Sequence, residues 1–199
     1  MDYRNIDWQT DRPDLVAIAR DWNRTIISPV HPIDPRLTAV VDVLNATHVN
    51  GGAQLAQFAI DAAPAIAWAL SRNRLSEFDL LHRFFSHANV TATLPAVCSP
   101  GPEIASFQME STFTAYGRLA GWISSGGAYE KSRASDEEAI NLAGDFMRAA
   151  FGMRFSEAFT WVNWKPWTDW FQDVAWDGSF VWFDTRKGVV TVLLITDTD

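Results

Sequence analysis

The chain has 199 residues, a formal net charge of −8 and a single cysteine, and 48% of its residues are hydrophobic. These values exclude a collagen-like, a disulfide-rich or a wholly disordered protein, and they fit one globular domain over residues 1–199. A chain of this size hides about 70% of its extended surface on folding, so one core can form without metals or crosslinks.

The first part of the chain predicts helices separated by short turns. Pro13 opens a segment with apolar residues at helical spacing, and Pro35 opens a second one. Residues 55–70 predict a third helix, which Pro64 kinks or restarts. A serine cap before the apolar positions of residues 76–85 predicts a fourth. The helical part of the fold is therefore expected to run from about residue 10 to residue 152.

The middle of the chain continues this helical part but also contains two candidate strands. Residues 90–97 and 104–109 predict strands on either side of a loop rich in proline and glycine. Apolar residues return to helical spacing over residues 113–123. Ser135 begins a capping box, so a further helix is expected from there until Gly152 ends it.

The last part of the chain predicts a three-stranded antiparallel meander. Asp177-Gly178 is a two-residue turn signal between residues 171–176 and residues 179–184. A four-residue turn then leads to a third strand over residues 189–195. The sequence thus predicts an α+β fold, in which helices pack on an antiparallel sheet that includes this meander, at about residues 171–196.

The register of the predicted meander sorts its side chains onto two faces, because side chains alternate along a strand. Trp182 is expected opposite Thr191, and Asp184 opposite Val189. One face is wholly apolar and should form the core: Val174, Trp176, Val181, Phe183, Val190, Val192 and Leu194. The other face mixes rings with carboxylates and is the candidate docking surface: Asp173, Ala175, Phe180, Trp182, Asp184, Thr191, Leu193 and Ile195.

Three acidic residues gather at one end of the predicted sheet. The register brings Asp177 close to Asp197, with Asp199 just beyond. This group fits a solvated sheet end, a landing site for a basic partner, or a carboxylate pair for metal binding or acid–base chemistry. Calcium usually takes about six or more oxygen ligands from an ordered loop, so no metal site is expected here.

Tryptophan is concentrated just before and within the meander. Six of the ten tryptophans lie within residues 161–182, and four of them recur at every third position. They fit either a large aromatic core or a recognition surface, since tryptophan is enriched among binding hot spots. Pro166 interrupts any long helix through the run, so some rings should stay partly exposed. Trp167, Trp170 and Trp182 are the candidates for partner contact.

Other residues that could carry chemistry do not form a recognisable site. His82 and His87 are five residues apart, which is a poor spacing for joint zinc binding on a helix. Cys98 has no basic neighbour in the sequence that would lower its pKa, which favours an inert thiol. No phosphate-binding glycine loop or nucleophile elbow occurs, so no cofactor is expected.

The charge of the chain limits the kinds of partner it can hold. A net charge of −8 argues against nucleic acid, whose phosphates need a basic surface, and favours a basic protein. No apolar stretch approaches the ~20 residues that cross a bilayer, so no membrane contact is expected. The acidic N-terminus lacks a secretory pattern and the cysteine has no partner, so the cytoplasm is the expected location.

The last 80 or so residues carry a layout that resembles a known group of proteins. Gly126-Gly127-Ala128-Tyr129 precedes a capped helix, and the pattern Trp167-x-x-Trp170-Phe171-x-Asp173-Val174-Ala175-Trp176-Asp177 and a terminal Thr196-Asp197-Thr198-Asp199 follow it. This layout resembles that of small bacterial immunity proteins of polymorphic toxin systems. The resemblance implies a cytoplasmic, non-catalytic α+β protein that binds and neutralises a toxin domain, and it transfers no binding residues.

Charge, composition and resemblance together favour a non-catalytic protein-binding module, an immunity-type inhibitor that occludes a basic toxin domain. Its expected contact residues are Asp173, Asp177, Asp197, Asp199, Trp167, Trp170 and Trp182. Two alternatives stay open: a hydrolase-type enzyme with an acidic, tryptophan-lined cleft, and a module that binds a small ligand or a carbohydrate.

Overall fold

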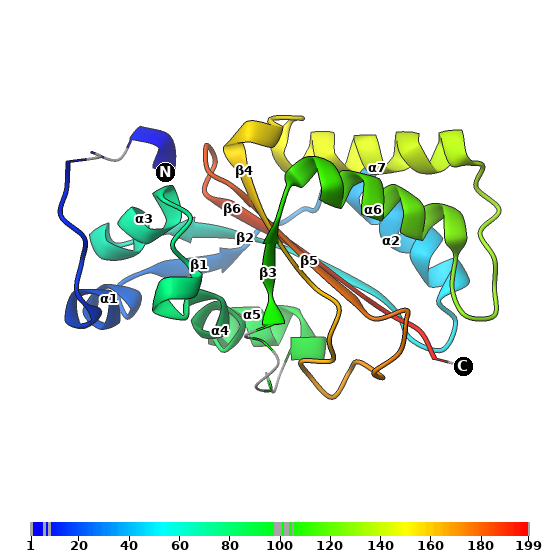
Figure 1. Cartoon of the computed structure of the whole chain (residues 1–199), viewed down its shortest axis with the longest axis horizontal. Helices are drawn as coiled ribbons and strands as arrows, with labels where there is room; N and C mark the ends of the chain where they lie inside the picture. Colours follow the sequence, from blue (N-terminus) through cyan, green and yellow to red (C-terminus); the bar gives the residue numbers. More distant parts are fainter. Residues whose placement is uncertain are drawn as a thin grey trace.

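A computed structural model describes residues 2–5, 7, 9–97, 101, 104 and 106–198. Within this described part, six antiparallel strands form one sheet in the order β1-β2-β6-β5-β4-β3 (Figure 1). The strands are β1 (Ile26–Pro29), β2 (Gly52–Asp61), β3 (Gln108–Glu110), β4 (Ala158–Asn163), β5 (Gly178–Asp184) and β6 (Val189–Thr196). The α+β class with an antiparallel sheet is therefore confirmed.

Helices cover both faces of the sheet (Figure 1). One face packs against α2 (Pro35–Thr47), α6 (Thr112–Ser125) and α7 (Asp136–Phe151). The other face packs against α1 (Leu15–Trp22), α3 (Pro64–Ser71), α4 (Leu80–Phe85) and α5 (Ala88–Thr93). Short 3-10 turns complete the described elements: η1 (Tyr3–Asn5), η2 (Ser76–Phe78), η3 (Pro95–Val97) and η5 (Phe155–Glu157).

The hairpin at the end of the chain has the register that the sequence predicts. In the ladder between β5 and β6, Trp182 lies opposite Thr191 and Asp184 lies opposite Val189. The capping box at Ser135 is also present, where its hydroxyl accepts from the N–H of Glu138 and starts α7. Strong local turn and cap signals thus fixed these elements.

The predicted three-stranded meander is present as β4-β5-β6, but the position predicted for its first strand is wrong. Residues 171–176 form a loop, and the strand beside β5 is β4, which pairs Val162 with Phe180. The Asp177 carboxylate accepts from backbone N–H groups of this loop, and Asp173 has a φ of 58°, so the chain turns where a strand was expected. Asp177-Gly178 is the entry to β5 rather than a hairpin turn.

The expected exposed face of the sheet is also wrong, because α2, α6 and α7 cover it. The rings of Phe180 and Trp182 on this face stack at a centroid distance of 5.2 Å and lie in the core, with Leu193 and Ile195 beside them. On the face predicted to be the core, Val181 and the other predicted residues of β5 and β6 are buried, but Val174 and Trp176 are only half-buried because they lie in the loop. Helices therefore cover both faces of the sheet, whereas the sequence predicts a helical layer on one face only.

Three other segments differ from their predicted form. Residues 55–62, expected in a helix, belong largely to the strand β2, where alternate residues Ala56, Phe58 and Ile60 enter the core. Residues 90–97, expected as a strand, form the end of α5 and η3. The segment expected at 104–109 contributes only the beginning of β3, which spans three residues.

The N-terminal turn is anchored to the sheet through a buried tyrosine. The Tyr3 hydroxyl donates to the Ile60 carbonyl at 2.8 Å and accepts from the Ala62 N–H at 3.2 Å. Its ring packs on Phe183 at 5.3 Å, and its own N–H donates to the Thr185 carbonyl at 2.8 Å. Burial raises the pKa of Tyr3 to about 12, because the phenolate would lose its hydration.

The raised pKa of Tyr3 predicts a loss of stability in alkali. Between about pH 10 and about pH 12 the unfolded tyrosine ionises while the folded one stays protonated, so the free energy of unfolding should fall by roughly 2–3 kcal/mol. Tyr3→Phe should flatten this dependence, whereas Tyr129→Phe, at an exposed tyrosine, should keep it. Urea unfolding across this pH range measures how the free energy of unfolding changes with pH in the unaltered chain and in the two variants. An equal change in all three would contradict the assignment of the raised pKa to Tyr3.

Candidate functional site

The strongest candidate site lies where the loop between β4 and β5 meets the C-terminal half of α6. This loop, residues 164–177, is called here the tryptophan loop, and it runs along the lower edge of the molecule in orange (Figure 1). It contains four tryptophans and the acidic residues Asp169, Asp173 and Asp177. Loops held by a rigid scaffold commonly carry binding function.

The sequence predicts Asp177 at the surface, but its side chain is only 2% exposed. It holds the tryptophan loop from inside. One carboxylate oxygen accepts from the N–H groups of Gln172 at 3.1 Å and Val174 at 3.2 Å. The other accepts from the Thr196 hydroxyl at 2.6 Å. The buried charge is thus solvated by donors from the loop and from β6, which fixes the loop to the sheet.

Asp197 is likewise buried, at 0% exposure, which corrects its expected surface position. Its carboxylate accepts from the Asn50 N–H at 3.0 Å and the Ala128 N–H at 2.7 Å. A Cβ at Gly127 would lie 2.4 Å from this carboxylate, so only glycine allows the approach. Asp197 therefore joins the turn before β2 to the loop between α6 and α7.

The two carboxylates lie at the same end of the sheet, as the parity argument predicted, but they do not form one acidic surface. The register pairs Gly178 with Ile195, which places Asp177 just before β5 and Asp197 just after β6. Each carboxylate binds the backbone of a different loop. The third acid of the predicted group, Asp199, lies outside the described residues.

Trp167 and Trp182 belong to the core, with only 1% of each exposed. Trp167 donates its indole N–H to the Ser179 hydroxyl at 2.8 Å and packs on Phe85 at 4.5 Å. Trp182 packs on Phe146 from α7 at 5.2 Å. The expectation that these two rings contact a partner at the surface is therefore corrected, because buried rings cannot be reached in the folded chain.

The tryptophan loop nevertheless presents rings and charges to solvent. Trp170 and Trp176 are half-buried, and Trp164 is 36% exposed. Asp169 and Asp173 are exposed beside them. Six of the seven residues predicted for partner contact lie in the described part of the chain, and among these the structure places the side chains of Asp173 and Trp170 at the surface.

A stack of rings supports the loop from α6. His48 stacks on Trp122 at 5.8 Å, Trp122 stacks on Trp164 at 6.3 Å, and the Arg118 guanidinium lies over Trp164 at 5.2 Å. A Cβ at Gly178 would come within 2.9 Å of Trp122, so the glycine leaves room for this ring. Burial lowers the pKa of His48, which favours a neutral imidazole in the stack.

A groove of about 320 Å³ opens between α6 and the tryptophan loop. It is lined by Arg118, Gly121, Trp122, Ser125, Gly126, Ala175 and Trp176. Its lining carries a guanidinium and no carboxylate, so it is not the acidic cleft that the hydrolase alternative required. Sequence reasoning missed Arg118 and Trp122, because on α6 they fall outside the apolar stripe and nothing local shows that a distant loop lies over them.

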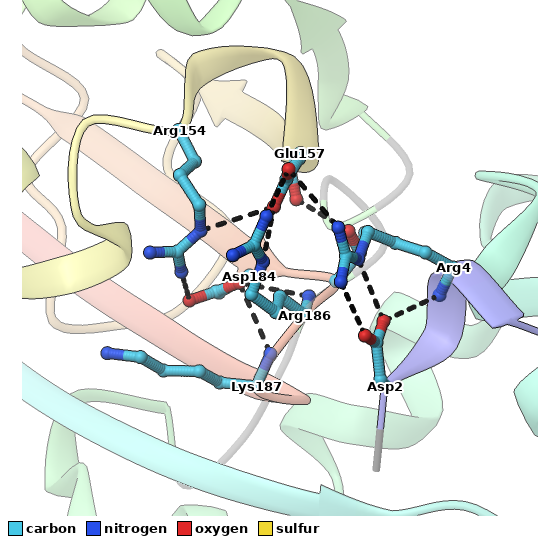
Figure 2. Close-up of polar contacts among 8 residues, drawn as sticks. Asp2, Arg4, Arg154, Glu157, Asp184, Arg186 and Lys187 are labelled. Carbon is cyan, nitrogen blue, oxygen red and sulfur yellow. Dashed lines mark hydrogen bonds and ion pairs between the residues drawn. The ribbon is translucent and has the colours of Figure 1, made fainter.

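A second polar cluster lies at the β5–β6 turn and the N-terminus (Figure 2). Glu157 pairs with Arg186 at 2.6 Å, Arg154 at 3.2 Å and Arg4 at 3.3 Å. Asp184, which is 2% exposed, pairs with Arg154 at 2.5 Å. Arg186 holds the pKa of Glu157 below its usual value. Each of these guanidiniums is already bound to a carboxylate, so the cluster is a brace between the N-terminus, η5 and the hairpin.

Further features of the described part of the chain narrow the chemistry. No group of three or more histidine, cysteine, aspartate or glutamate side chains in this part is arranged to hold a metal ion. Within the same residues, no helix combines the length and apolar character needed to cross a membrane. Cys98 lies outside the described residues.

Comparison with known proteins adds no assignment. The sequence matches no protein-family model, and a search of curated proteins finds no match. Function must therefore be inferred from the geometry and charge of the described residues.

The role of Asp177 predicts a specific loss of stability. Asp177→Ala leaves two part-buried N–H groups and the buried Thr196 hydroxyl without their acceptor, so unfolding should become easier by about 2–3 kcal/mol. The tryptophan loop should also become more sensitive to limited proteolysis. Asp169→Ala, in the same loop but exposed, should change stability by no more than about 0.5 kcal/mol. An equal change of melting temperature in the two variants would contradict the role of Asp177 in holding the tryptophan loop.

Proposed function

We propose that the chain is a non-catalytic protein-binding module of the immunity type, acting in the cytoplasm, which occludes a basic toxin domain. The observation that carries this proposal is the tryptophan loop, a segment that Asp177 ties to the sheet and that carries partly exposed rings among exposed carboxylates. Trp164, Trp170 and Trp176 supply the rings, and Asp169 and Asp173 supply the charges.

The rings suit a role as anchors. Tryptophan is enriched among residues that dominate binding energy, because it removes a large rigid surface from water at little entropic cost. The loop is held by Asp177 and, through Trp164, by the ring stack on α6. Such a loop loses little freedom on binding, and this preorganisation favours affinity.

The charges suit a basic partner. With a net charge of −8, the chain attracts a cationic protein at long range, and Asp169 and Asp173 place two of these charges beside the rings. Complementary charges accelerate association and disfavour wrong partners. Covering the partner's active surface would neutralise it, so binding alone performs the function.

Charge reversal in the loop tests this proposal. A basic partner captured at equal stoichiometry by the immobilised chain should associate at least about tenfold more slowly with the Asp169→Lys/Asp173→Lys variant at low salt. The control, Asp42→Lys/Glu137→Lys, makes the same change of net charge at exposed positions on α2 and α7 and should slow association much less. Surface plasmon resonance measures both rates, and circular dichroism checks the fold.

Two outcomes would contradict the proposal. An equal loss of rate in both variants would show that net charge, not the tryptophan loop, directs binding. A captured partner whose affinity survives both the charge reversal and Trp170→Ala would place its contact elsewhere on the molecule.

A second candidate function is the binding of a small ligand, and the groove beside the tryptophan loop favours it. The groove's volume of about 320 Å³ and its tryptophan walls are typical of sites that hold a single small molecule. Such a module would also act by binding alone, so the two candidates differ in partner rather than in chemistry.

A further inference from the structure

We propose that the groove between α6 and the tryptophan loop binds a small planar aromatic compound that carries a carboxylate. This inference uses only the residues that line and support the groove. It names the ligand class for the second candidate function and rests on it, and it is independent of the protein-binding function proposed first.

The aromatic walls favour a planar ligand. Trp122 comes from α6 and is fixed by its stacking on His48 and Trp164. Trp176 comes from the tryptophan loop and is half-buried, and no ring in the described part of the chain stacks on it. A flat ring can therefore pack beside Trp176, where no aromatic ring of the described residues lies, in the offset or edge-on arrangement that aromatic pairs prefer.

Arg118 determines the charge that the groove accepts. Its Nε donates to Glu110 at 2.8 Å and its guanidinium lies over Trp164, so the side chain is held in one orientation although it is 47% exposed. Its two terminal nitrogens have no acceptor among the described residues. A guanidinium presented in this way binds a carboxylate through paired hydrogen bonds.

A cationic ligand would fit poorly at the same place. The position over the Trp164 ring that an ammonium or guanidinium would seek is already taken by Arg118. The lining residues also offer no carboxylate to a cation. Among the described lining residues the one charged group is the Arg118 guanidinium, whose Nε pairs with Glu110 and whose terminal nitrogens are left for a ligand.

The floor and the size of the groove limit the ligand to one ring system. A Cβ added at Gly121 would meet no atom within 4 Å, so a ligand can lie close to the backbone of α6. Ser125 adds an exposed hydroxyl to the lining. A volume of about 320 Å³ is near the lower end of the range for small-molecule sites, roughly 300–1,000 Å³. A bicyclic ring with a short acidic arm is therefore the expected class.

Three probes that share the indole ring system but differ in charge test the proposal on the full chain. Indole-3-acetate is an anion, indole is neutral and tryptamine is a cation. Indole-3-acetate should bind at least about tenfold more tightly than tryptamine, since a hydrogen bond to a charged group contributes about 1.5–3 kcal/mol. NMR spectra of the indole N–H groups follow each titration. The signals of Trp122 and Trp176 should shift, whereas the signal of the remote Trp68, whose N–H donates to the Thr10 carbonyl, should stay unchanged.

Substitutions at Arg118 and Trp176 test the contributions of the charge and of the aromatic wall separately, and a substitution at Arg72 is the control. Arg118→Gln should bring the ratio of the affinities for indole-3-acetate and tryptamine close to one and leave the affinity for indole unchanged. Arg72→Gln removes a similar arginine, which lies over Trp68 at 4.6 Å away from the groove, and should keep the ratio of the unaltered chain. Trp176→Ala should weaken all three probes. Thermal melts check that the variants fold.

The proposal is overturned if tryptamine binds as tightly as indole-3-acetate, or if Arg118→Gln leaves their ratio unchanged. It is also overturned if none of the probes shifts the signals of Trp122 and Trp176. None of these results depends on a protein partner, so the groove can be refuted while the protein-binding function stands, and the reverse is equally true.

Discussion

The arrangement of the loops at one end of the sheet depends on two buried carboxylates. Asp177 and Asp197 are buried, and each accepts hydrogen bonds from part-buried backbone N–H groups of the loops around it. Because a buried charge is stable only when donors surround it, the loops must stay closed on these side chains. These two acids, predicted to contact a partner, instead lie below the surface, where they hold the loops that a partner or ligand would contact.

The burial of both sheet faces explains why function is proposed at the end of the sheet. A strand with apolar residues on both sides, such as β5, cannot offer a face to solvent, so Phe180 and Trp182 pack under helices. The polar backbone and the partly exposed rings then collect in the loops beyond the strand ends. The two ends of the sheet differ: arginine–carboxylate pairs around Glu157 brace one end, whereas the tryptophan loop and its groove form the other.

The sequence predicted those parts of the fold whose signals are local. The β5–β6 register follows from the four-residue turn between the strands, and α7 follows from the capping box at Ser135. It did not predict β2, because Leu55, Phe58 and Ala62 also fit a helical spacing, and the neighbouring strands that decide between the two forms are distant in the chain. The displaced first strand of the meander has the same cause, since Asp177 turns the chain through donors that a linear pattern does not show.

The candidate site was even less visible in the sequence, since it is assembled from separate segments. The groove needs Trp122 and Arg118 from α6, Trp176 from the tryptophan loop, and a glycine at 178 that leaves space for the ring stack. Each of these residues has an ordinary role when read alone: a helical aromatic, a surface cation, a loop ring and a turn residue. Their shared location follows from β4 pairing with β5, because this pairing returns the loop across the end of α6. The groove therefore cannot be predicted when the strand beside β5 is assigned wrongly. With the observed pairing, Arg118 lies beside Trp122 and Trp176 and is the residue best placed to select a ligand.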